Sequence, residues 1–122
     1  MSEKESSLYG WAFKAGRKIM EIFESMYGAE RAEKKMENLL LTLRSELLPE
    51  RFRRSIIDCL IEVRPDVGIP EEVKSEKRWS VDEFYRYSTA ILSGFFDALN
   101  SWRRGKGEGE EKKKEKGREH AK

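Results

Sequence analysis

Apolar residues recur every three or four positions along most of this chain, a spacing that predicts α-helices. The apolar stripes cover four segments: residues 8–26, 32–47, 52–63 and 81–102. No comparable stretch alternates between apolar and polar residues at every second position, the pattern that would predict β-strands. The sequence therefore predicts an all-α fold, a bundle of four main helices.

Residues with strong positional preferences mark the ends of these helices. Gly28 suits the left-handed conformation in which many helices stop, and Pro49 is tolerated at the first position of a helix. Ser80 and Glu83 fit a capping box, in which each side chain accepts a hydrogen bond from the other residue's backbone N–H. Because prolines and a glycine interrupt the pattern after residue 63, we expect a long connection, holding at most one helical turn, before the fourth helix.

The final segment of the chain differs in composition from the rest. Residues 103–122 contain no large apolar side chain, but nine Lys or Arg and five Glu. Such a segment buries too little apolar surface to offset the entropy lost on ordering. We therefore expect a helical bundle domain at residues 1–102 and a disordered charged tail at residues 103–122.

The composition of the chain bears on its location in the cell and on its source. Of the 122 residues 39% are charged, and 25 Lys+Arg against 23 Asp+Glu leave a net charge of +2. No apolar run is long enough to cross a membrane, and the first residues lack the apolar core of a signal peptide, so we expect a cytoplasmic protein. Glutamine is absent and Lys, Arg and Glu abound, which is typical of a hyperthermophile; compositional drift in a helical sequence is the alternative.

Three patterns could indicate catalysis or metal binding, and each has a simpler explanation. Asp66, followed by Glu72 and Lys74, is similar to the acid–acid–lysine pattern of metal-dependent nucleases, but no predicted strand brings them together. Cys59 lacks a base, because the only histidine, His120, lies in the tail. Glutamates on helix faces alternate with Lys and Arg, as on solvated surfaces. We therefore expect no enzyme activity, no metal site and no cofactor.

Basic residues form the strongest candidate for a binding site. The guanidinium group of arginine is planar, always charged and able to make paired hydrogen bonds with phosphate. Three arginines crowd the start of the third helix, and more basic residues follow in the long connection and the fourth helix. The predicted nucleic-acid-binding residues are Arg51, Arg53, Arg54, Lys74, Lys77, Arg78 and Arg86. The alternative is that neighbouring carboxylates neutralise them, for example Asp58 beside Arg54.

Aromatic side chains outside the cleanest apolar stripes form a second candidate. They are Tyr9, Trp79, Tyr87, Phe96 and Trp102. Large apolar groups that stay exposed often mark surfaces for protein partners. A thin bundle could instead use the same rings to complete its core, and the sequence leaves both interpretations open.

The segment from Glu83 to Leu99, EFYRYSTAILSGFFDAL, resembles the closing helix of the small helical subunits of CRISPR interference complexes, where an aromatic-rich helix runs into an apolar-Gly-aromatic segment. The resemblance implies a non-catalytic subunit that contacts other subunits, stacks in copies and supports guide RNA or a single-stranded target through basic surfaces. One alternative is a helical adaptor or dimerisation module without a nucleic-acid role. Another is a DNA-binding regulator, although the long connection does not fit a helix-turn-helix.

Overall fold

A computed structural model describes the backbone of residues 1–120 and the side chains of residues 1–106. Its helices are α1 (Glu3–Tyr27), α2 (Ala29–Ser45), α3 (Pro49–Val63), the single turn α4 (Glu71–Lys74) and α5 (Val81–His120). Within residues 1–120 there is no strand. The predicted all-α fold with four main helices is therefore confirmed, and the long connection contains one helical turn.

The helices begin and end where local chemistry favours it. Gly28 has a φ of 86° and joins α1 directly to α2. Pro49 occupies the first turn of α3. The predicted capping box is present, because the Ser80 and Glu83 side chains each accept a hydrogen bond of 3.0 Å from the other residue's backbone N–H.

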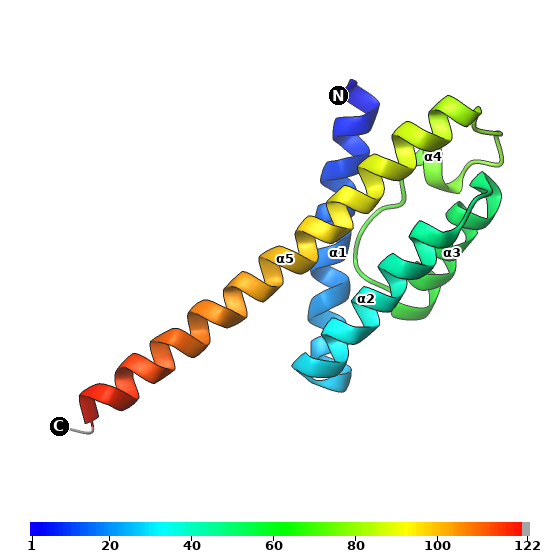
Figure 1. Ribbon diagram of the computed structural model, residues 1–122. Coiled ribbons are helices and arrows are strands. Elements are labelled where there is room, and N and C mark those ends of the chain that lie inside the picture. The colour runs from blue at the N-terminus through cyan, green and yellow to red at the C-terminus, as the bar shows by residue number, and fades with distance from the viewer. Residues whose placement is uncertain (121–122) are drawn as a thin grey trace.

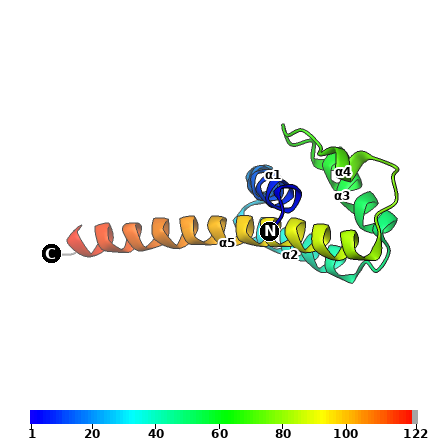
Figure 2. The same ribbon diagram turned by 90° about the horizontal axis from the view of Figure 1, so that it is seen from above.

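Helix α5 is the longest element, and it crosses α1 while running alongside α2 (Figure 1). Seen from above, α1 lies on one side of α5, α3 and α4 lie near its N-terminal end, and its C-terminal half extends beyond the other helices (Figure 2). The core fills the space between α1, α2, α3 and α5. Its largest fully buried side chains are Leu8, Ile19, Met20, Met36, Leu43, Phe52, Ile56, Val73, Ile91, Phe95 and Leu99.

Gly94 sets the distance at which α1 and α5 cross. A Cβ atom at this position would lie 2.5 Å from the backbone oxygen of Tyr9 and 2.9 Å from the backbone nitrogen of Phe13. Only a residue without a side chain lets the two backbones approach so closely. The close crossing of α1 and α5 therefore requires glycine at position 94.

The region after Trp102 differs from the expected boundary between bundle and tail. Arg103 and Lys106 pair with carboxylates of α2 and α1, and the backbone of α5 is helical as far as His120. The side chains of residues 107–122 lie outside the described part, so the expected disorder of the tail stays a prediction. No helix among the described residues is both long and apolar enough to cross a membrane.

Candidate interaction surfaces

Arg53, one of the predicted nucleic-acid-binding residues, points into the protein. It shares the buried face of α3 with Phe52 and Ile56, and only 5% of its surface is exposed. Its Nη1 atom donates hydrogen bonds to the backbone carbonyls of Ser75 at 2.9 Å and Lys77 at 2.8 Å. Arg53 is therefore withdrawn from the predicted binding surface, because its guanidinium already holds the backbone that follows α4.

The ring of Trp79 packs against the guanidinium group of Arg53. The Arg53 Cζ atom lies 4.8 Å from the Trp79 ring centroid, within the range of a cation–π interaction. Trp79 also packs against Phe52, Phe84 and Tyr87, with ring centroids 5.4 to 6.4 Å apart. Arg53 and Trp79 together join α3, the long connection and the start of α5.

Arg51 and Arg54 are exposed, unlike Arg53. They line a groove of about 530 Å³ together with Lys74 and the largely buried Arg53, so the structure brings four of the predicted residues to one groove. The alternative, an ion pair between Arg54 and Asp58, does not form, since among residues 1–106 neither Arg51 nor Arg54 has a carboxylate oxygen within 4.0 Å. The groove is nevertheless mixed in charge, because it is also lined by Glu50, Asp58 and Glu76.

The remaining predicted basic residues do not extend this groove. Arg86 is held by Glu5 at 3.1 Å and by Asp82 at 2.9 Å, and the charge of Asp82 raises the Arg86 pKa above its ordinary value. Lys77 and Arg78 are exposed and line a different hollow, next to Trp79. The seven predicted residues therefore do not form one continuous basic surface.

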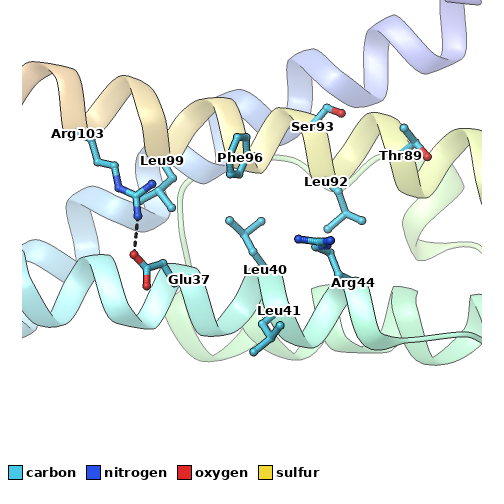
Figure 3. A pocket seen from close by; sticks show the side chains of 10 residues that line it. All are labelled: Glu37, Leu40, Leu41, Arg44, Thr89, Leu92, Ser93, Phe96, Leu99 and Arg103. Carbon is cyan, nitrogen blue, oxygen red and sulfur yellow. Dashed lines mark hydrogen bonds and ion pairs between the residues drawn. The ribbon is translucent and has the colours of Figure 1, made fainter.

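A second groove, largely apolar, lies between α2 and α5 and has a volume of about 490 Å³ (Figure 3). Its middle is formed by Leu40 and Leu41 of α2 and by Leu92, Phe96 and Leu99 of α5. Two of these side chains are exposed, Leu41 at 63% and Phe96 at 52%. The groove is thus an apolar patch that no part of residues 1–106 covers.

Charged residues stand at both ends of this groove. At one end Arg103 of α5 reaches across to α2 and binds Glu37 and also Glu33, the latter at 2.9 Å (Figure 3). At the other end stands Arg44, which is exposed and has no carboxylate oxygen within 4.0 Å in the described part of the chain. The first end therefore has an excess of negative charge and the second end an excess of positive charge.

The structure shows which of the five aromatic residues belong to the core and which are exposed. Tyr87 and Trp102 are buried, and Tyr9 and Trp79 are half-buried against the core, so these four complete the core. Of the five, only Phe96 is exposed. Leu41, which is also exposed and lines the same groove, was missed, although its place outside the apolar stripe of α2 is a signal that could have found it.

The residues considered for catalysis are Cys59 of α3 and the pair Asp66 and Lys74. Burial and the neighbouring charge of Glu62 raise the pKa of Cys59 to about 11, which disfavours the reactive thiolate. Asp66 and Lys74 are exposed residues of the long connection and α4. Nowhere in residues 1–106 do three or more His, Cys, Asp or Glu side chains come together in a group that could hold a metal ion.

Comparisons with models of protein families, with curated proteins and with solved structures give no match to this chain.

Proposed function

We propose that this protein is a non-catalytic small helical subunit of an RNA-guided CRISPR defence complex, in which it supports guide RNA or a target strand. The observation that carries the proposal is the pair Arg51 and Arg54, exposed at the start of α3 without a carboxylate partner among residues 1–106. The resemblance of residues 83–99 to the closing helix of such subunits gives the setting. A cytoplasmic location and a hot habitat belong to the same proposal.

The positive charges of Arg51 and Arg54 have no carboxylate partner among residues 1–106. Two arginines near the N-terminal end of a helix repel each other and the positive end of the helix dipole. A bound phosphate relieves this repulsion, and guanidinium groups suit phosphate better than ammonium groups because they offer paired donors. Since the groove also contains carboxylates, we expect moderate, salt-sensitive binding to a backbone and no recognition of particular bases.

The test is binding to a mixed-sequence single-stranded RNA at several salt concentrations. Arg51→Glu and Arg54→Glu should each weaken binding and lower the slope of log affinity against log salt by about 0.7 for each phosphate that the variant no longer neutralises. Arg31→Glu is the matched control, because Arg31 is also exposed near the start of a helix but lies on α2, outside the groove. If Arg51→Glu, Arg54→Glu and Arg31→Glu all bind like the wild type, the nucleic-acid role is wrong.

A helical dimerisation or adaptor module is the second candidate function. The specific observation in its favour is the apolar groove between α2 and α5, with Phe96 and Leu41 exposed. Surface apolar patches of this kind mark protein–protein contacts. Indifference to nucleic acid combined with dependence on Phe96 for assembly would favour this function over the first.

A further inference from the structure

We infer that the groove between α2 and α5 is the contact surface of a two-fold symmetric dimer of this chain. This groove is a different surface from that of Arg51 and Arg54, so the dimer does not depend on nucleic-acid binding. The partner that occupies the groove is a second copy of the chain.

The apolar part of the groove has the form that an interface needs. Phe96 projects from α5 beside Leu92, and Leu40 projects from α2 toward α5, whereas Leu41 lies on the lower side of α2 in this view (Figure 3). Aromatic anchors in apolar surroundings contribute most of the free energy at interfaces. Phe96 and Leu41 are both exposed, and both line the groove.

The charges indicate that the occupant is a second copy. Glu37 and Arg44 are seven residues apart on α2, which is two helical turns or roughly 10 Å. They stand on opposite sides of Leu40 and Leu41 (Figure 3). A two-fold axis that lies in the contact plane and crosses the middle of the groove at right angles exchanges the two ends of the groove, and so places Arg44 of each copy against Glu37 of the other.

This arrangement satisfies the rule for a closed dimer, in which the same patch is used twice and must complement itself. The end with Glu37 carries two carboxylates, Glu33 and Glu37, against the single guanidinium of Arg103. That end therefore attracts Arg44 of the second copy even though Arg103 lies there. Helices α2 and α5 run in opposite directions along the groove (Figure 3). In the dimer, this pair of helices would pack face to face on the same pair of the second copy.

The first experiment measures the mass of the full chain by sedimentation over a wide range of concentration. Wild type should shift from 14.3 kDa towards twice that mass. Phe96→Glu should raise the dissociation constant by roughly 30-fold or more, as for the loss of an interface anchor. Tyr85→Glu is the matched control, since Tyr85 is an exposed aromatic residue of the same helix outside the groove, and it should dimerise like the wild type.

The second experiment tests the two-fold symmetry. Arg44→Glu alone places like charges together at both ends of the dimer contact, and so does Glu37→Arg alone, so each should dimerise several-fold more weakly than the wild type. A mixture of the two variants pairs opposite charges at both ends. Native mass spectrometry should therefore show the mixed dimer in excess over either homodimer.

Circular dichroism establishes that each variant is folded before its mass is interpreted. A folded wild type that stays monomeric at every concentration would overturn the inference and assign the groove to a partner of different sequence. A wild-type dimer that Phe96→Glu leaves intact, or a mixture without an excess of mixed dimer, would equally show that this symmetric contact does not form. None of these outcomes depends on RNA binding, so the failure of either proposal can be recognised separately.

Discussion

The guanidinium group of Arg53 is buried between α3 and the segment that follows α4. A buried cation is tolerated only when its hydrogen-bond donors are used, and this guanidinium donates to the backbone of residues 75 and 77 and packs on Trp79. Its carbonyl partners belong to the irregular segment after α4. Arg53 therefore acts as a structural residue that gives this segment a fixed course.

Replacing Arg53 should destabilise the protein more than replacing its exposed neighbour. Arg53→Ala removes the donor of partly buried carbonyl groups and the side chain that packs on Trp79, and we expect the free energy of unfolding to fall by about 2–4 kcal/mol. Arg54→Ala removes an exposed side chain and should change it by less than about 0.5 kcal/mol. Urea denaturation measures both. Equal, small effects would mean that the hydrogen bonds of Arg53 are not important for stability.

At the scale of the helices, the crossing of α1 and α5 depends on small residues. Gly94 meets the backbone of α1 at Tyr9 and Phe13, and Gly16 of α1 faces Ala98 of α5, where an added Cβ would lie 2.8 Å from the Ala98 Cβ. Small side chains on both helices let the axes approach closely. Gly10 of α1 has no such neighbour, because nothing lies within 4 Å of the position that its Cβ would take.

Gly94 and Gly10 should respond oppositely to the same substitution. Gly94→Ala forces a methyl group against fixed backbone atoms, so we expect a loss of at least about 2 kcal/mol in the free energy of unfolding. Gly10→Ala meets open space inside a helix and should stabilise the protein by about 0.5–1 kcal/mol. Thermal unfolding followed by circular dichroism measures both variants. A stable Gly94→Ala protein would show that α1 and α5 can separate without penalty.

The elements themselves were largely predictable, whereas the surfaces were not. Apolar spacing and the residues at the helix ends, Gly28, Pro49 and Ser80, are local signals, and the helices that they predict are confirmed. Gly28 does end α1 with a positive φ of 86°, but its ψ of 165° lies outside the left-handed helical region that the sequence predicted. The inward direction of Arg53 depends on carbonyl groups more than twenty positions away in an irregular segment. The groove between α2 and α5 depends on which face of α2 meets α5, and periodicity within α2 alone does not determine that.

For the molecule as a whole, carboxylates pair with α5 near both ends of α1. Near the start of α1, burial acts to raise the pKa of Glu5, but hydrogen bonds from Ser2 and Arg86 outweigh it and leave the pKa below its ordinary value. Near the end of α1, hydrogen bonds from Lys106 and Trp102 lower the pKa of Glu24. Both carboxylates thus bind protons less readily in the folded state than in the unfolded state.

This difference predicts how stability depends on pH. A carboxylate with a lowered pKa in the folded state contributes its full stabilisation above its unfolded pKa, here 4.5, and loses it as the pH falls through the folded value. We therefore expect the unfolding temperature to decrease as the pH falls below about 4.5. Glu24→Gln should reduce this decrease, whereas Glu21→Gln, an exposed position of the same helix, should not. Equal pH profiles for wild type and Glu24→Gln would contradict this account.

The crossing of α1 and α5 also has a consequence for the order in which the chain can fold. Helix α1 packs mainly against α5, which the ribosome synthesises after all the other described helices. The hairpin of α1 and α2 can form early, because Gly28 joins the two helices directly. Its apolar face must then stay open until α5 has been synthesised, because α5 provides most of the contacts of α1. The nascent chain therefore passes through a stage with an unfilled core, and aggregation competes with folding at that stage.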